Sequence, residues 1–270
     1  MKATKPILSI FLSVALAVTA ATGCSNNEKT STEQTKVVKV GTDAAYAPFE
    51  YLDNGKVVGF DVDFLEAVMK EANLEYELQN KGWEPLFASL KSGEIDMGIS
   101  AITIDEKRKK TYDFTSPYFE STQMIMVKEG SPVKKADDMK KLKVGVQVGT
   151  TGQMAAEKLL GKNSSQIAKY ENNALAIMAL KNGEVEAVVA DNTVVEEYVK
   201  NNPGDKLIAI EDKESFEPEY YGLMFKKGSK LRGKVDKAVQ EVIENGTYAE
   251  IYKKWFKTDP DIDALKKAKL

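Results

Sequence analysis

Short apolar runs alternate along the chain with segments in which apolar residues recur at helical spacing. The run of valines within 37–40 predicts a first strand, which ends at Gly41. From Phe60 to Ala72 an apolar residue returns at every fourth position, which predicts a helix with its apolar face in the core. Strands that alternate with helices are typical of an α/β fold.

The same alternation continues through the rest of the chain. Pro85 suits a first helical turn and Gly93 suits a C-terminal cap, so a helix is predicted between them. Thr103 followed by Glu106 is a capping-box signature, which places Arg108 in the first turns of a short helix. Further strands are predicted at 75–78, 95–99, 143–148 and 185–190, and further helices at 153–160, 174–182, 230–244 and 247–256.

Two stretches of the chain resemble each other. Residues 90–100 and 180–190 both combine the end of a helix, a glycine cap and a strand. Two copies indicate two similar lobes, because a solenoid needs three or more regular repeats. The last helices most simply complete the first lobe, so the chain is expected to cross between the lobes twice, near 118–123 and near 219–223. Two crossings predict a hinge and a cleft. The predicted first lobe comprises 37–121 and 221–270, and the predicted second lobe comprises 122–220.

Residues 1–23 have the layout of an export signal. Two lysines precede an apolar core at 7–21, and small residues follow up to Cys24. Residues 21–24 resemble the lipobox of bacterial lipoproteins, which implies that Cys24 is lipidated. An uncleaved membrane anchor is disfavoured, because about 15 apolar residues are fewer than the ~20 that span a bilayer. The polar stretch 24–36 is predicted to be a flexible tether, so the protein is expected outside the cytoplasm, lipid-anchored to the outer face of the cell membrane.

The composition excludes several classes of enzyme. The chain contains no histidine, and its one cysteine lies outside the predicted fold. Histidine acid–base catalysis, Ser-His-Asp and Cys-His nucleophiles and typical zinc sites are therefore ruled out. The net charge of −3 argues against nucleic acid, a partner that favours a basic surface. We expect a monomer without metal or cofactor, in which carboxylate, lysine or tyrosine chemistry stays open.

The segment 41–51 places an acid and an aromatic residue at the end of the first strand. Pro48 interrupts the strand ladder and favours an extended Ala47, which leaves Asp43 and Tyr46 on a loop. Ligands of open α/β sheets bind at the carboxyl ends of strands. The alternative interpretation is an exposed Asx turn with a tyrosine that serves packing.

Several motifs are spread over residues 37–257: Gly41–Phe49, Gly59–Asp63, Ile95–Ser100, Asp105–Arg108, Gly149–Thr151, Tyr221–Gly222, Gly246–Tyr248 and Trp255–Phe256. Together they resemble the type II extracellular solute-binding proteins of polar amino-acid ABC transporters, particularly arginine-, lysine- and ornithine-binding lipoproteins. The resemblance implies a two-lobed periplasmic-binding-protein-like fold in which each lobe is a mixed sheet flanked by helices. It also implies a binding protein that is not an enzyme and that delivers a free basic amino acid to the permease subunits of an importer.

An amino-acid ligand needs a cation for its carboxylate and an acid for its ammonium group. Arg108 offers a bidentate fork, and the resemblance assigns it to the carboxylate. Asp191, at the end of a predicted second-lobe strand, is assigned to the ammonium group. The alternatives are a surface cation at Arg108 and a helix N-cap at Asp191. Further head-group contacts are expected from backbone donors near Ser100, Ala101 and Thr103 and from the helix N-terminus after Thr151.

The side chain of the ligand is expected at the other end of the cleft. Tyr46 and Trp83 would form its walls by apolar burial and cation–π contact, and Asp43 would neutralise its distal charge. Gln147 is expected to line the second-lobe wall. These residues predict arginine first, then lysine, with ornithine or histidine weaker. Glutamine is the rival ligand, because an acid beside a neutral amide also suits a carboxamide.

Closure of the two lobes around the ligand is the expected mechanism. A lyase on the same scaffold is one rival, but it would need a general acid or base, and the predicted cleft acids are committed to ligand charges. The sensor domain of a signalling receptor is another rival, for which a membrane helix and a cytoplasmic domain would be expected beyond Leu270.

Overall fold

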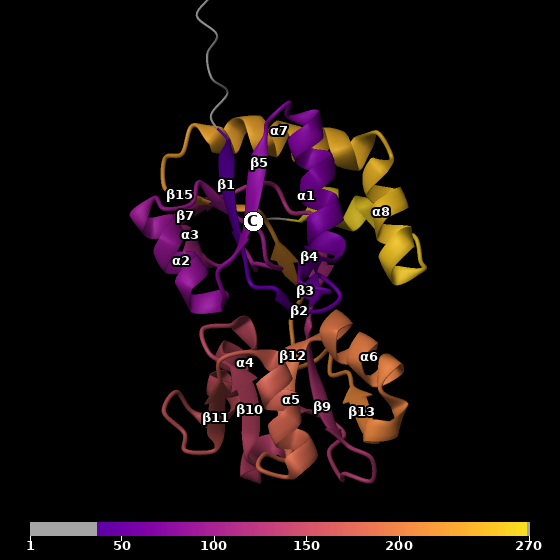
Figure 1. Ribbon diagram of the computed structural model, residues 1–270. Helices are drawn as coiled ribbons and strands as arrows, with labels where there is room; N and C mark the ends of the chain where they lie inside the picture. The colour runs from indigo at the N-terminus through magenta and orange to yellow at the C-terminus, as the bar shows by residue number, and fades with distance from the viewer. Residues whose placement is uncertain (1–36, 269–270) are drawn as a thin grey trace, which may run out of the picture. The chain divides into compact units, whose positions relative to one another are not determined.

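Two five-stranded sheets form the framework of residues 37–268, the part of the chain that the computed structural model describes (Figure 1). The first sheet contains β1 (Val38–Thr42), β5 (Tyr76–Asn80), β6 (Met97–Gly98), β7 (Tyr112–Phe114) and β15 (Met224–Lys226), in the order β5-β1-β6-β15-β7. The second contains β9 (Gln123–Lys128), β10 (Val144–Gln147), β11 (Ile167–Tyr170), β12 (Ala187–Asp191) and β13 (Leu207–Ile210), in the order β11-β10-β12-β9-β13.

Both sheets are mixed. In the first, β1 runs parallel to β5 and β6, whereas β15 is antiparallel to β6 and β7. In the second, β10 runs parallel to β11 and β12, whereas β9 is antiparallel to β12 and β13. This arrangement confirms the predicted α/β class with a mixed sheet in each of two lobes.

The first lobe is the first sheet with the helices packed on it. These helices are α1 (Phe60–Glu71), α2 (Trp83–Ser92), α7 (Leu231–Glu244) and α8 (Thr247–Phe256). The apolar face predicted for α1 is buried, with Phe60, Phe64 and Val68 fully enclosed. Helices α7 and α8 both contact α1, and the apolar stripe of α7 joins the same core as β1. Helix α2 packs over a separate apolar cluster with Ile95 and Met224.

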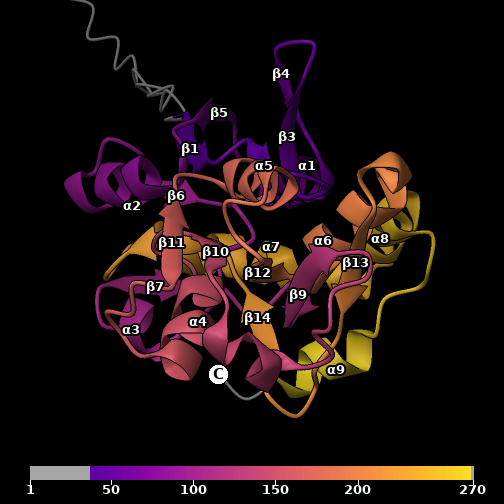
Figure 2. The same cartoon turned by 90° about the horizontal axis from the view of Figure 1, so that it is seen from below.

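The second lobe is the second sheet with α4 (Thr151–Leu160), α5 (Asn173–Asn182) and α6 (Asn192–Asn201). Alternation along β12 divides its side chains between two cores. Ala187 and Val189 pack with Ala156 of α4, whereas Val188 and Ala190 pack with residues of α5 and α6. Figure 2 accordingly shows α4 and α5 on opposite sides of β10 and β12. A strand buried on both faces explains the continuous apolar run at 187–190.

The chain passes between the two sheets through a short two-stranded pairing. Strand β8 (Phe119–Ser121) connects β7 to β9, and β14 (Glu219–Tyr221) connects β13 to β15. The two strands pair antiparallel, with Tyr221 opposite Phe119. Both connections lie in the segments predicted to cross between the lobes, while the predicted lobe boundaries stay a prediction.

The short helix that carries Arg108 begins differently from the prediction. Helix α3 (Glu106–Lys109) is capped by Asp105, whose side chain accepts from the backbone N–H groups of Lys107 and Arg108. The predicted capping box from Thr103 was wrong. Thr103 is instead extended and bridged to Tyr221, so it lies too far before the helix to cap it.

The remaining elements flank this framework. They are β2 (Ala45–Tyr46), β3 (Glu50–Asp53) and β4 (Lys56–Val58), which form a small antiparallel sheet, the 3₁₀ turns η1 (Ala136–Lys141) and η2 (Pro203–Asp205), and α9 (Ile262–Lys267). No helix within 37–268 has the length and apolar character to cross a membrane. The predicted export signal, Cys24 and the tether lie outside the described residues.

Candidate functional site

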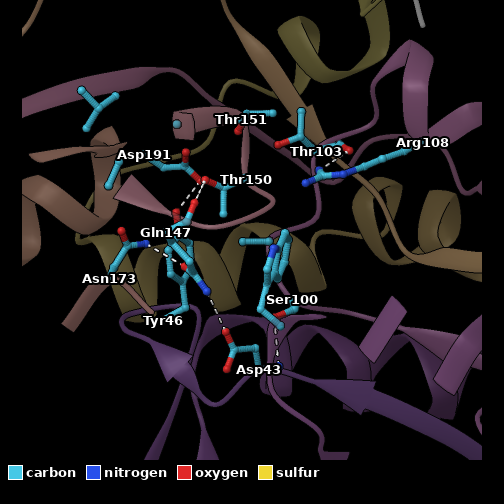
Figure 3. Close-up of a pocket in the computed structure, with 15 residues that line it drawn as sticks. Asp43, Tyr46, Ser100, Thr103, Arg108, Gln147, Thr150, Thr151, Asn173 and Asp191 are labelled. Atoms are coloured by element: carbon cyan, nitrogen blue, oxygen red, sulfur yellow. Dashed lines mark hydrogen bonds between the residues drawn. The ribbon is translucent and has the colours of Figure 1, made fainter. Parts of the chain in front are cut away.

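One cavity brings together every residue that the sequence predicted for the ligand site. It has about 390 Å³ of space, part of it open to solvent, and is bordered by the ends of β1, β6, β10 and β12 (Figure 3). The predicted residues along it are Asp43, Tyr46, Trp83, Ser100, Ala101, Thr103, Arg108, Gln147, Thr151 and Asp191. The cavity is also lined by Thr150, Gly152, Asn173, Val189 and Ala190, which the sequence analysis did not name as site residues.

The guanidinium of Arg108 is buried and held from three directions. Its Nη1 donates to the Thr103 carbonyl at 2.8 Å, and its Nε lies 3.2 Å from the Asp105 carboxylate. Its Nη2 donates to the Gly149 carbonyl of the second lobe at 3.3 Å. Only 8% of Arg108 is exposed, which excludes the alternative of a surface cation. Burial lowers the pKa of Arg108, but a guanidinium stays protonated at neutral pH.

Trp83 both borders the cavity and supports Arg108. The guanidinium carbon lies 5.3 Å from the Trp83 ring centre and 5.4 Å from that of Phe87. The two rings meet edge to face at 4.9 Å. A planar guanidinium stacks well on such rings, so the aromatic pair fixes the direction of the fork.

The start of α4 borders the cavity opposite the first lobe. Thr150 caps this helix by accepting from the Gln153 N–H, which leaves Thr151 and Gly152 in the first turn. A Cβ on Gly152 would lie 2.8 Å from the Val189 carbonyl oxygen, so only glycine fits against β12. The unsatisfied N–H groups of a first helical turn favour an anion.

Asp191 ends β12 and turns its carboxylate into the cavity (Figure 3). Although it occupies the N-cap position of α6, its side chain makes no capping hydrogen bond, which excludes the alternative of a structural cap. Its Oδ1 accepts from Gln123 Nε2 at 2.5 Å, and its Oδ2 accepts from the Tyr46 hydroxyl at 2.6 Å and from the Tyr221 hydroxyl. Tyr46, expected only as a wall, thus joins the two lobes.

Asp43 directly follows β1 and contacts an amide chain from the second lobe. Gln147 Nε2 donates to Asp43 Oδ2 at 3.2 Å and to the Glu171 carbonyl at 3.2 Å. Gln147 Oε1 in turn accepts from Asn173 Nδ2 at 3.1 Å. Because a carboxylate only accepts, Asp43 orients Gln147, and Gln147 orients Asn173. Burial raises the pKa of Asp43, the Gln147 hydrogen bond opposes the rise, and the charge of Glu171 adds to it.

The sequence did not predict that Asn173 and Glu219 belong to the site. Asn173 begins α5 after β11, just as Thr151 begins α4 after β10. This equivalence of position in the fold is the signal from which Asn173 could have been predicted as a site residue. Glu219 Oε1 accepts from Gln123 Nε2 at 3.0 Å and lies 3.2 Å from the Thr151 hydroxyl. Burial, followed by the nearby charge of Asp191, raises the pKa of Glu219 well above its usual range. No local pattern singles out Glu219, because its partners come from distant segments.

The described residues hold no cluster of three or more acidic, histidine or cysteine side chains arranged for a metal ion. The site is built instead from one buried cation, two separate acids and a helix N-terminus. Figure 3 places Asp43 on one side of the cavity, apart from Arg108, Thr151 and Asp191. Such an arrangement suits a ligand with charges of both signs at one end and a donor-rich group at the other.

Comparison with known proteins agrees with this geometry. A probable histidine-binding protein of Neisseria gonorrhoeae is 42% identical over 226 residues, which cover 82% of this chain and 83% of that protein. The crystal structures of the arginine-, lysine-, histidine-binding protein ArtJ from Geobacillus stearothermophilus match at a TM-score of 0.85 and 60% identity, over 86% of this chain and all of that one.

An ancestral arginine-binding protein, solved with arginine and separately with glutamine, matches at 40% identity and a TM-score of 0.77, over 82% of this chain and 98% of that one. The family model of the bacterial extracellular solute-binding proteins, family 3, matches residues 38–258. The relatives that it resembles are binding proteins and not enzymes, and the chain belongs to the bacterial extracellular solute-binding proteins of family 3.

Proposed function

We propose that this protein captures a free basic L-amino acid outside the cytoplasm and delivers it to the permease of an ABC importer. Arginine is the preferred ligand, followed by lysine, with ornithine and histidine weaker. The observation that carries the proposal is a single cavity with Arg108 and Asp191 at one end and the buried acid Asp43 at the other. The binding specificities of ArtJ and of the ancestral protein support the same class of ligand.

The head group of the ligand is assigned to the Arg108 end of the cavity. The guanidinium of Arg108 and the first-turn N–H groups of α4 take the carboxylate, because both present donors to an anion. Asp191 takes the ammonium group. Ser100, Ala101 and Thr103 also line the cavity, although the Ala101 N–H is engaged by Asp61 at 2.8 Å and the Ser100 hydroxyl lies beside Asp43.

The distal group of the ligand is assigned to Asp43. A guanidinium or an ammonium group neutralises this carboxylate, while Tyr46 and Trp83 enclose the alkyl chain. Gln147 already donates to Asp43, so a ligand cation would share the carboxylate with one amide. The rival ligand is glutamine, which a relative of this chain accommodates besides arginine. The charge of Asp43 favours the cation.

Lobe closure is proposed to seal the ligand inside. Several hydrogen bonds already join the lobes, among them those of Tyr46 with Asp191, Gln147 with Asp43, and Arg108 with Gly149. These hydrogen bonds stabilise a closed arrangement that a permease can recognise.

The lipid anchor at Cys24 is proposed to keep the protein at the cell membrane. In metabolic labelling with palmitate, the parent protein should carry the label and a Cys24→Ser variant should not.

Thermal-shift measurements on ligand-stripped protein test the proposed ligand class. The panel is the twenty amino acids and ornithine. At a ligand concentration of 100 times Kd, binding adds about 2.7 kcal/mol to the free energy of unfolding, which raises Tm by roughly 5–10 °C in a protein of this size. Arginine is expected to give the largest shift. A panel in which no basic amino acid moves Tm would reject the proposal.

Replacing Tyr46 with phenylalanine tests the bond between the lobes. The variant keeps the ring that stacks near Phe49 but loses the donor to Asp191. We expect the Kd for arginine to rise about threefold to tenfold, because a single hydrogen bond contributes about 0.5–1.5 kcal/mol. Isothermal titration calorimetry measures the change, with Tyr51→Phe outside the cavity as the control. Equal affinities of Tyr46→Phe and the parent would contradict the role of this hydroxyl.

A further inference from the structure

Two carboxylic acids lie buried behind the proposed ligand site. Glu50 begins β3 and Asp61 lies in the first turn of α1, and their exposures are 0% and 1%. Within residues 37–268, the charged and titratable groups that act on this pair are acids and phenols, without a lysine or arginine. Two buried acids without a cation are costly, so their retention needs a reason.

Both acids form hydrogen bonds, from the side of the protein core, with residues that line the cavity. Glu50 Oε1 accepts from the Ser100 hydroxyl at 2.7 Å, and that hydroxyl accepts from the Asp43 N–H at 3.0 Å. Asp61 Oδ2 accepts from the Ala101 N–H at 2.8 Å. The pair therefore holds Asp43, Ser100 and Ala101 in place without itself lining the cavity.

Ala101 shows why such support is needed. Its φ of 44° lies in the left-handed region, in which the Cβ of a non-glycine residue is crowded against the backbone. A conformation of this kind persists only where the surroundings enforce it. The Asp61 carboxylate enforces it here by accepting the Ala101 N–H, while the Tyr118 hydroxyl holds that carboxylate at 2.9 Å from both of its oxygens.

The hydrogen bonds also indicate which acid carries a proton. Glu50 Oε2 is buried and has no partner as an acceptor, which fits an oxygen that bears hydrogen. Burial, followed by the charge of Asp61, raises the pKa of Glu50 well above its usual range, whereas burial raises the pKa of Asp61 to about 6. The hydrogen-bond partners therefore assign the proton of the pair to Glu50 and the negative charge to Asp61.

We propose that Glu50 and Asp61 are positioning residues of the amino-acid site. Ionised Asp61 fixes the left-handed turn at Ala101, and neutral Glu50 fixes Ser100 and, through it, the backbone of Asp43. This inference rests on the proposed function for its effect on affinity. It assigns a binding role to two residues that touch no ligand.

The role requires that Glu50 stay neutral. Loss of its proton would place a second charge beside Asp61 and near Asp43, with the phenols of Tyr46 and Tyr118 as the other titratable groups that face it. A raised pKa in the folded state means that the folded protein binds the extra proton, so this contribution to stability is present at low pH and is lost as pH rises through that pKa. Affinity and stability should both fall as pH rises through the raised pKa of Glu50.

Variants of Glu50 separate neutral hydrogen bonding from simple packing. Glu50→Gln keeps an acceptor for Ser100 and a donor for Asp61, whereas Glu50→Met fills the space and loses both. By calorimetry near neutral pH we expect the Kd for arginine to stay within about threefold in Glu50→Gln and to rise about tenfold in Glu50→Met. Met69→Leu, elsewhere in the same buried core, is the matched control and should leave Kd unchanged.

A pH series adds a readout that a packing role would not move. As pH rises through the raised pKa of Glu50, the affinity of the parent should fall more steeply than that of Glu50→Gln, because the amide has no proton to lose. Titration of the ligand ammonium group affects the parent and Glu50→Gln equally, so it cancels in the ratio of their two Kd values. Parallel pH profiles, or a Glu50→Gln variant as weak as Glu50→Met, would overturn the inference. Asp61→Asn, expected to weaken binding about tenfold, replaces Glu50→Met if that variant does not fold.

Ligand-free protein distinguishes this inference from the proposed function. Infrared difference spectra of the parent against Glu50→Gln should show the C=O band of one protonated carboxylic acid at neutral pH. Amide exchange at Ala101 should speed up in Asp61→Asn. If the parent does not bind arginine, the proposed function fails, while these two readouts still decide whether the pair holds the turn. Absence of both signals would overturn the positioning role even if arginine binds.

Discussion

Replacing Arg108 with alanine is expected to abolish measurable capture of amino acids. The side chain is the buried cation at the head-group end of the cavity, and its loss leaves both the ligand carboxylate and Asp105 without their partner. Removing one member of a buried, hydrogen-bonded charge pair costs about 2–5 kcal/mol, which weakens binding by roughly 30-fold to several thousandfold. Calorimetry with arginine measures the loss.

Two further variants sharpen this expectation. Arg108→Lys keeps the charge but loses the planar fork that contacts the Thr103 and Gly149 carbonyls, so it should recover only a small part of the affinity. Lys107→Ala removes an exposed cation from the same short helix and should change Kd little. If Arg108→Ala bound arginine as tightly as the parent, the assignment of the ligand head group to this end of the cavity would be wrong.

Replacing Asp43 with asparagine is expected to change which ligand is bound. The Kd for arginine should rise about 100-fold, because the buried carboxylate is the partner proposed for the distal cation. Glutamine carries no distal charge, so its affinity should be kept or improved. Calorimetry with both ligands measures the switch, and Asp53→Asn at the exposed end of β3 is the control. Full retention of arginine affinity would refute the charge assignment.

The same residue predicts a dependence on pH. Burial raises the pKa of Asp43, and a guanidinium binds the ionised form. Arginine affinity of the parent should therefore fall as pH falls through that raised pKa. Glutamine affinity should not follow the same course, nor should either affinity in Asp43→Asn. The comparison isolates Asp43 from Asp61, whose pKa of about 6 applies to all of these proteins.

Local sequence patterns predicted many of the helices and strands of the fold. The four-residue spacing of α1 and the apolar stripe of α7 survive as buried faces, because a helix must turn its apolar side to the core whatever it packs against. Gly93 ends α2 in the left-handed conformation that glycine allows. The capping box at Thr103 failed because the helix begins two residues later, with Asp105 as its N-cap, while Thr103 is bridged to Tyr221.

The sequence could not predict which side chains form hydrogen bonds with each other. Asp191 meets Tyr46 across 145 positions of the chain, and Gln147 meets Asp43 across 104. Glu219 and Gln123 meet only because β14 and β8 pair where the chain passes between the sheets. No spacing rule links residues so distant, and each pairing exists only once both sheets are formed.

The sequence by itself determined the alternating elements, the residues at the strand ends and the chemical types that an amino-acid site needs. Its motifs also identified the family. The tertiary structure decided which of those residues share one cavity, that Arg108 is buried on Trp83, and that Tyr46 bonds to Asp191. It alone showed that Glu50 and Asp61 are buried together and that burial raises the pKa of both, because the pKa of a buried acid depends on its surroundings and not on its neighbours in sequence.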